Sequence, residues 1–365
     1  MFCRLDIRRF CGLLSLLLVL LITTGAWAQA NELVLHFIDV GQGDSILIQT
    51  PAGASILIDA GDTRAGTQTV VPYLRKMGIK SLDMVVLTHP HFDHVGGLIP
   101  VLEEYPVDQV LADGQIHTTQ AYEDLLGLIY EKGISFKLAR AGDELDIPGL
   151  DKVVVLNPQE PFLPGLNNNS VVLELHHGTI AVLLAGDIEA AAEERILAEG
   201  YLSEAQILKA AHHGSKTSST RVFLRKVKPA IGVVSVGAGN RYGLPDKKVI
   251  ETMNKAGIEV LRTDLLGTII VVSDGSSYRV VDQEELLSGK PQSKERDTSV
   301  SSTKLVNVNT AAHEQLMQLP GIGDVLARRI IEAREAAAFQ KPEDLLRVAG
   351  IGPKRLEKLV SLITF

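Results

Sequence analysis

A tight group of metal-binding side chains follows a short apolar run, and this group constrains the fold more than any other feature of the chain. His89, His91, Asp93 and His94 lie within six positions, directly after the apolar residues Met84–Leu87. The apolar run predicts a buried strand, and the residues after it predict a loop that opens into a helix. At such a strand end, alternate side chains point to the same side. Three of the ten histidines of the chain lie here, which favours a site over scattered surface positions.

The donor atoms of this group are imidazole nitrogens and carboxylate oxygens, which suit Zn²⁺, Mn²⁺ or Fe²⁺. Both cysteines of the chain, Cys3 and Cys11, lie in its first thirty residues. The rest of the chain must therefore build a metal site from histidine and carboxylate. We expect two divalent ions, Zn²⁺ or Mn²⁺, and hydrolytic chemistry, because such ions lower the pKa of water to about 7 and stabilise charge on reacting oxygens.

Short strand-like segments alternate with helical segments from Asn31 to about Asp282. Glycine, proline and aspartate bound the strand-like runs, and the helical segments have apolar residues three to four positions apart. This alternation predicts an α/β domain with two sheets. The expected strands are Leu33–Asp39, Ser45–Gln49, Ser55–Asp59, Asp83–Thr88, Val153–Leu156, Val171–Leu175, Ile180–Leu184, Ile231–Val236 and Thr268–Val272, and the expected helices are Val71–Met77, Gln120–Lys132 and Glu189–Glu199.

The His-x-His-x-Asp-His run resembles the signature of the metallo-β-lactamase superfamily. Further segments, in the same order along the chain, resemble the extracytoplasmic hydrolase domain of the ComEC competence family, and the similarity extends from about Leu33 to Ser273. These segments are Phe37–Ser45, Leu57–Asp62, Asn167–Val172, Leu184–Glu189, Leu208–Ser215 and Arg262–Ile269. The resemblance implies a four-layer αββα fold and a metal-dependent phosphodiesterase.

The same resemblance implies a ligand set. His89 and His91 would hold one ion, and Asp93 and His94 the other. Asp187 would bridge the two ions. The last ligand would come from the pair His212–His213; we favour His213 as the ligand and His212 as a proton-transfer partner, although the sequence does not separate them. Asp59 would orient an imidazole from behind the ligands, as such carboxylates do, so we expect Asp93, His212 and Asp59 to contribute to catalysis.

Two departures from the family pattern concern positions where a histidine is often found. Many members carry a further histidine where this chain has Asn168, Asn169 and Ser170, and Leu244 stands where a histidine often precedes a proline. The departures imply weaker binding of the first ion, so the chain would hold one ion or two. The expected substrate contacts are Ser215, Lys216 and Asn169.

The first thirty residues have the pattern of an export signal. Arg4, Arg8 and Arg9 precede the apolar run Gly12–Ile22, and an Ala-x-Ala ending follows at Ala28. This pattern predicts a signal peptide over residues 1–28 and a secreted or extracytoplasmic protein without a stable membrane span. The alternative is an uncleaved N-terminal anchor, although the apolar run is shorter than the ~18 residues typical of a span.

A polar segment divides the remainder of the chain into two parts. Residues 284–303 are rich in serine and charge, and we expect them to form a linker between a hydrolase domain over 31–283 and a second domain over 304–365. The first domain has 21 basic and 32 acidic residues, a net charge of −11, whereas the second has 9 and 7, a net charge of +2. This asymmetry indicates two different partners.

The second domain contains the repeated pattern Gly-Ile-Gly, which predicts two tight turns that each lead into a helix. The backbone N–H groups of such a turn bind phosphate without reading bases, so the interaction would be independent of sequence and sensitive to salt. The segment Lys304–Phe365 resembles the helix-hairpin-helix pair of the ComEA DNA receptor family. The resemblance implies DNA contacts at Gly321, Gly323, Arg328, Gly350, Gly352, Lys354 and Arg355.

Together these patterns predict a secreted, metal-dependent nuclease that acts on DNA without sequence specificity and is related to DNA uptake. One alternative is a hydrolase of small or lipid phosphodiesters, because this fold accepts many substrates. Another is a non-catalytic protein that captures extracytoplasmic DNA, with the departures at Asn168–Ser170 and Leu244 marking a lost site.

Overall fold

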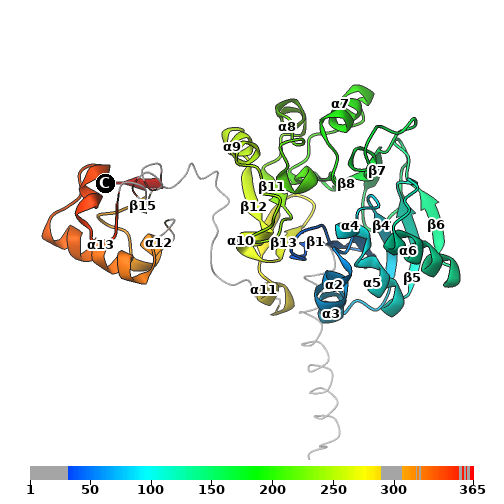
Figure 1. Ribbon diagram of the computed structural model, residues 1–365, viewed down its shortest axis with the longest axis horizontal. Helices are drawn as coiled ribbons and strands as arrows, with labels where there is room; N and C mark the ends of the chain where they lie inside the picture. Colours follow the sequence, from blue (N-terminus) through cyan, green and yellow to red (C-terminus); the bar gives the residue numbers. More distant parts are fainter. Residues whose placement is uncertain are drawn as a thin grey trace, which may run out of the picture. The chain divides into compact units, whose positions relative to one another are not determined.

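The computed structural model describes residues 32–288, 306–317, 319, 322–352, 356, 359 and 362–365. The predicted signal peptide and all of the predicted linker after Ser288 lie outside these residues, as do Gly321, Lys354 and Arg355. The described residues form two compact units, divided between Gln292 and Ser293 (Figure 1). Each unit is described by itself below.

Two sheets form the centre of the first unit. The larger sheet has eight strands in the order β14-β13-β1-β2-β3-β4-β5-β6, and the smaller has six in the order β12-β11-β10-β9-β8-β7. The strands of the larger sheet are β1 (Leu33–Phe37), β2 (Ile46–Gln49), β3 (Ser55–Ile58), β4 (Leu82–Leu87), β5 (Val107–Ala112), β6 (Ser135–Leu138), β13 (Ile269–Ser273) and β14 (Tyr278–Val281). Those of the smaller sheet are β7 (Lys152–Asn157), β8 (Val172–His177), β9 (Ile180–Leu184), β10 (Ile207–Lys209), β11 (Ile231–Val234) and β12 (Glu259–Arg262).

The two sheets pack face to face, and helices cover both outer faces (Figure 1). One buried cluster joins alternate residues of both sheets, such as Leu35 and Val182. A second cluster joins the other face of the larger sheet to α3 (Val71–Lys76), α5 (Leu98–Glu104) and α6 (Gln120–Glu131). A third joins the smaller sheet to α7 (Ala190–Glu199), α8 (Arg221–Val227) and α9 (Lys247–Lys255). The architecture is therefore the four-layer αββα arrangement that the sequence implied.

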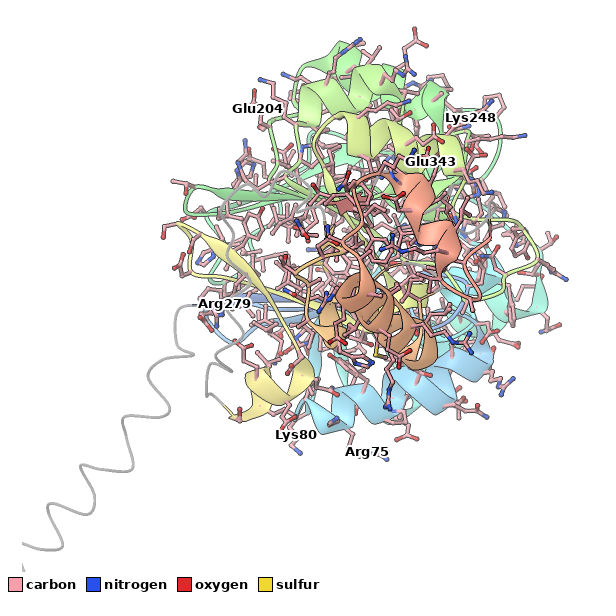
Figure 2. All side chains as sticks on the ribbon, turned by 90° about the vertical axis from the view of Figure 1, so that its left-hand side faces the viewer. Arg75, Lys80, Glu204, Lys248, Arg279 and Glu343 are labelled. Atoms are coloured by element: carbon pink, nitrogen blue, oxygen red, sulfur yellow. The ribbon has the colours of Figure 1, made fainter. Side chains whose placement is uncertain are left out.

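The outer helices and the loops between them carry many of the exposed charged residues. The side chains of Arg75, Lys80, Glu204 and Lys248 all project away from the body of the first unit (Figure 2). Short helical segments complete this unit: α2 (Thr63–Ala65), η1 (Gly66–Val70), α4 (Phe92–Val95), η2 (Asn167–Asn169), η3 (Ala211–Gly214), α10 (Thr263–Leu266) and α11 (Gln283–Ser288). Helix α11 includes residues 284–288, which the sequence assigned to the start of the linker; Leu286 packs against the sheet and explains the difference.

The second unit is small and helical. A two-stranded parallel sheet pairs β15 (Val306–Asn307) with β16 (Ile363–Thr364), which brings the two ends of the unit together. Its described helices are α12 (His313–Met317), α13 (Asp324–Ala336) and η4 (Pro342–Arg347). A separate apolar cluster, which includes Leu316, Ile330, Phe339 and Leu359, forms its core. None of the helices in the described parts of the chain combines the length and the apolar character needed to cross a membrane.

Candidate metal centre

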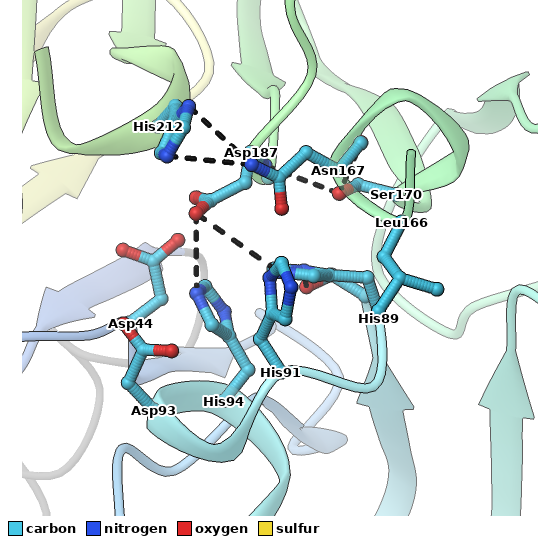
Figure 3. A network of polar contacts seen from close by, with 12 residues as sticks. Asp44, His89, His91, Asp93, His94, Leu166, Asn167, Ser170, Asp187 and His212 are labelled. Carbon is cyan, nitrogen blue, oxygen red and sulfur yellow. Dashed lines mark hydrogen bonds and ion pairs between the residues drawn. The ribbon is translucent and has the colours of Figure 1, made fainter. Parts of the chain in front are cut away.

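The predicted ligands converge at one edge of the two sheets, where four strands end (Figure 3). Strands β3 and β4 run parallel in the larger sheet, and β9 and β10 run parallel in the smaller. Their carboxyl ends are followed by Asp59, by the loop from Thr88 to His94, by Asp187 and by His213, respectively. Parallel strands deliver the residues after their carboxyl ends to the same edge, which is why segments far apart in the sequence meet here.

His89 and His91 face each other at one side of the cluster. The Nε2 atom of His89 lies 2.9 Å from Nδ1 of His91 and 4.0 Å from Oδ2 of Asp187. His89 is fully buried, and burial lowers its pKa well below the ordinary value, with the neighbouring His94 acting in the same direction. Two neutral imidazoles beside a carboxylate are a suitable donor set for a divalent ion.

His94 and His213 face Asp187 from the other side. Their Nε2 atoms lie 3.4 Å and 3.3 Å from Oδ2 of Asp187, and Nε2 of His213 lies 3.8 Å from Oδ2 of Asp93. Burial alone would lower the pKa of both histidines. The charge of Asp187 outweighs burial, together with Asp59 for His94 and Asp44 for His213. The pKa of His94 is therefore raised well above its ordinary value, and that of His213 to about 9.

Asp59 and Ser235 fix the orientation of these two imidazoles. Oδ2 of Asp59 accepts hydrogen bonds from Nδ1 of His94 at 2.7 Å and from the Thr88 hydroxyl at 2.6 Å. Nδ1 of His213 donates to the carbonyl oxygen of Ser235 at 2.9 Å. In both cases the bond at Nδ1 turns Nε2 toward Asp187, which is how a supporting contact selects the tautomer of a metal-binding histidine.

The unpaired atoms of the cluster fit a metal ion. Nε2 of His94, Nε2 of His213 and Oδ1 of Asp187 are buried and make no hydrogen bond of good geometry. The sets His89–His94–Asp187 and Asp93–His94–His213 each bring one donor atom per residue within 4.8 Å of the others. Buried polar atoms without partners are costly, and a divalent ion would pair them while replacing the protons on the two histidines.

Sequence reasoning did not assign a role to Asp44 and Lys209, which lie directly behind Asp187. Lys209 is fully buried; its ammonium pairs with Oδ2 of Asp44, lies 3.5 Å from Oδ1 of Asp187 and donates to the Gly186 carbonyl at 2.9 Å. Lys209 is visible in the sequence as a charged residue that interrupts the apolar run Ile207–Ala211. Strand β10 is too short for this pattern to show that the lysine side chain is buried.

The loop that carries Asp44 rests on the helix that carries Asp93. Gly43 has φ +127°, and a Cβ atom there would lie 2.2 Å from the Asp93 carbonyl oxygen. Glycine is therefore required at this position by both backbone conformation and close approach. This contact fixes the distance between the β1–β2 loop and α4.

His212 and His213 have different surroundings. Both have positive φ, 50° and 54°, within the short segment η3. His213 enters the cluster, whereas His212 keeps 24% of its side chain exposed beside Glu189, Thr217 and Asn167. The structure thus brings His213, and not His212, into contact with Asp187.

The residues expected to contact substrate occupy different environments. Ser215 is mostly buried and its hydroxyl lies 3.0 Å from that of Thr217, and Lys216 is exposed beside them. Asn169 is buried, with Oδ1 bound to the Leu163 N–H and Nδ2 bound to Gln115 and to backbone carbonyls. Its amide holds its own loop, and the structure does not bring it to the cluster.

The described DNA-contact candidates of the second unit are Gly323, Arg328, Gly350 and Gly352. Gly350 has φ +104°, and a Cβ atom there would lie 2.8 Å from the Leu326 side chain, so the second turn requires glycine. Gly323 precedes α13 as its N-cap residue. Three other arginines bind backbone carbonyls within the unit, namely Arg329, Arg334 and Arg347.

Both units of the chain have similar counterparts among known proteins. The sequence profile of the helix-hairpin-helix motif matches residues 301–364. ComE operon protein 3 of Bacillus subtilis is 32% identical over 256 residues, and competence protein ComA of Neisseria gonorrhoeae is 32% identical over 246 residues. Each alignment covers 66% of this chain, but the chain spans only about a third of these relatives, 33% and 32% of their lengths.

Solved structures include similar chains as well. The metallo-β-lactamase fold protein YhfI of Bacillus subtilis is 11% identical, with a TM-score of 0.46, over 66% of this chain and 100% of that chain. The sequence profile described as the metallo-beta-lactamase superfamily matches residues 38–238, more than half of the chain. With the αββα layers and the converging histidines and aspartates, this match shows that the chain belongs to the metallo-β-lactamase superfamily.

Proposed function

We propose that the chain is an extracytoplasmic, metal-dependent phosphodiesterase that cleaves DNA without sequence specificity. The observation that carries this proposal is the presence, in one chain, of the converging ligand cluster around Asp187 and of a helix-hairpin-helix unit. The competence proteins among its relatives support a role related to DNA uptake, and the predicted signal peptide supports an extracytoplasmic location.

Six residues would hold two divalent ions: His89, His91, Asp93, His94, Asp187 and His213. Such ions stabilise negative charge on phosphoryl oxygens and generate a nucleophile from water at neutral pH. The chain itself contributes orientation: Asp59 and Ser235 hold the imidazoles of His94 and His213 through their Nδ1 atoms. Buried Lys209 offsets part of the negative charge of Asp44 and Asp187.

His212 is suited to protonate the leaving oxygen of the cleaved ester. It lies at the rim of the cluster, partly exposed, with its Nδ1 3.4 Å from the Glu189 carboxylate and 3.3 Å from the Thr217 hydroxyl. The Glu189 carboxylate at Nδ1 leaves Nε2 beside Nδ2 of Asn167, at 3.3 Å; substrate would replace this amide contact and exchange a proton with Nε2, as general acid catalysis requires. Lys216 and Ser215 follow in the same loop and would contact phosphate oxygens.

The second unit would bind the DNA backbone and present it to the first. Backbone amides of the two glycine turns, with Arg328, Lys354 and Arg355, would contact phosphates. The first domain has a net charge of −11 and repels a polyanion. A linked module that holds DNA raises the local concentration of phosphodiester at the metal centre.

The substitution Asp187→Asn tests the proposal. It keeps the shape of the side chain but removes the charge on which both histidine pairs converge, so we expect DNA cleavage in Mn²⁺ or Zn²⁺ to fall by at least about 100-fold. Binding of the same DNA, measured by fluorescence anisotropy, should be unchanged because the second unit is intact. Cleavage by the variant at the wild-type rate would show that Asp187 is not part of the hydrolytic site, whereas DNA binding without cleavage by the wild type would favour a DNA-capture protein.

A further inference from the structure

Asn168, Asn169 and Ser170 stand where many family members carry a ligand histidine for the first ion, and Asn167 directly precedes them in the same loop. Without a side chain from this loop, that ion would have only His89, His91 and the shared Asp187. The second ion would have four donors, from Asp93, His94, His213 and Asp187. A fourth donor for the first ion would have to come from a side chain of this loop.

Three of the four side chains already have hydrogen-bond partners in the protein. Asn168 accepts from the Glu189 N–H and donates to the Pro164 carbonyl. Asn169 is held by Leu163 and Gln115. The Ser170 hydroxyl donates to the Asn167 carbonyl at 2.8 Å and accepts from the Asp187 N–H at 3.3 Å, so it ties Asn167 to the strand end that carries Asp187.

Asn167 differs from its neighbours in this loop. Its Oδ1 atom is buried and has no hydrogen-bond partner, whereas its Nδ2 lies 3.3 Å from Nε2 of His212. In Figure 3 the amide oxygen points toward the rings of His89 and His91, beside the Asp187 carboxylate. A buried carbonyl oxygen without a partner is unfavourable unless a cation or donor completes it.

We propose that Oδ1 of Asn167 is a ligand of the first metal ion, together with His89, His91 and Asp187. The inference rests on the proposed metal-dependent activity of the same site. It gives each ion two imidazoles, one oxygen donor of its own and the shared Asp187. An amide oxygen is a chemically harder ligand than an imidazole nitrogen. The first site therefore favours Mn²⁺ over Zn²⁺ more than a site with three histidines would.

Metal titration of the full chain by isothermal calorimetry, with Mn²⁺ as the probe, tests this assignment. We expect two ions for the wild type. Asn167→Ala should weaken one of them by at least about 10-fold, the lower end of what even a supporting contact contributes to metal affinity. Asn167→Asp retains an oxygen donor and should keep both ions, and Asn167→His should shift the weaker site toward Zn²⁺.

Asn168→Ala is the matched control, because it removes hydrogen bonds from the same loop but no proposed ligand. It should lower the melting temperature of the metal-free protein without changing either Mn²⁺ affinity. Unchanged Mn²⁺ binding by Asn167→Ala, or a wild type that binds no Mn²⁺, overturns the assignment. Two ions that depend on Asn167, in a protein that does not cut DNA, would support the assignment and contradict the proposed nuclease function.

Discussion

Lys209 is a buried cation between two carboxylates, and its removal should destabilise the first unit. The substitution Lys209→Met keeps the length of the side chain but leaves Asp44 and Asp187 buried without their cation. Breaking a buried ion pair on one side costs about 3–5 kcal/mol, so we expect the free energy of unfolding in EDTA to fall by that amount. Urea denaturation followed by circular dichroism measures it.

The exposed pair of Lys152 and Glu144 supplies the comparison. These side chains are 51% and 68% exposed and 3.2 Å apart, and exposed pairs contribute only about 0–1 kcal/mol. Lys152→Met should therefore leave the free energy of unfolding nearly unchanged. If Lys209→Met costs no more than Lys152→Met, the buried pair does not stabilise the fold.

Local motifs allowed the sequence to predict most of the cluster, because His89, His91, Asp93 and His94 are neighbours in the chain. The pairing of Asp44 with Lys209 joins the loop between β1 and β2 of the larger sheet to β10 of the smaller sheet, and a single sequence carries no signal for that contact. The same limit applies to the choice between His212 and His213. Contacts made in the fold decide it, since Nε2 of His213 lies 3.3 Å from Asp187 whereas Nδ1 of His212 lies 3.4 Å from Glu189.

At the scale of elements, apolar runs bounded by glycine, proline or aspartate located nine strands within one or two residues, but gave no prediction for β5, β6, β10, β12 and β14. Strand β1, for example, ends at Phe37 where the sequence predicted Asp39. Strand β6, Ser135–Leu138, was not predicted; its four residues are too few for a clear periodic pattern, and all four are exposed at the edge of the sheet. Strand β10 has only three residues, too few for a periodic pattern.

A buried histidine connects three elements and makes their packing sensitive to acid. His36 of β1 is bonded to the Tyr73 hydroxyl of α3 at 2.8 Å and to Oε1 of Gln49 of β2 at 2.9 Å. Burial lowers its pKa to about 4, despite the hydrogen bond with Gln49. Between about pH 6.5 and pH 4 the unfolded chain therefore binds a proton at His36 that the folded chain does not, and stability falls as the pH falls.

The expected loss from His36 is about 2 kcal/mol between pH 7 and pH 5. Carboxylates elsewhere also titrate, so the test compares the wild type with His36→Gln, which can still bond to Tyr73 and Gln49 without titrating. The free energy of unfolding of the variant should decline less over this interval, by about 2 kcal/mol. Parallel declines in the two proteins would show that His36 does not contribute to the acid sensitivity.

At the scale of the whole molecule, the two units differ in net charge and in the functional groups that they carry. The first has the candidate metal ligands and a net charge of −11 over residues 31–283, and the second has a net charge of only +2 over 304–365. Three of its arginines bind backbone carbonyls within the unit, which are Arg329, Arg334 and Arg347. Phosphate binding would therefore depend on backbone amides more than on a basic surface.

Deletion of residues 304–365 should separate binding of DNA from chemistry. A tether acts on local concentration, so the truncated chain should need a substrate concentration at least about 10-fold higher to reach half of its maximal rate on long DNA, with little change in that maximal rate. Hydrolysis of bis-p-nitrophenyl phosphate, which is too small to engage the second unit, should remain at the wild-type rate. The advantage of the full chain should also shrink as salt rises, because phosphate contacts release counterions. Equal cleavage of long DNA by both chains at every salt concentration would mean that the second unit serves another partner.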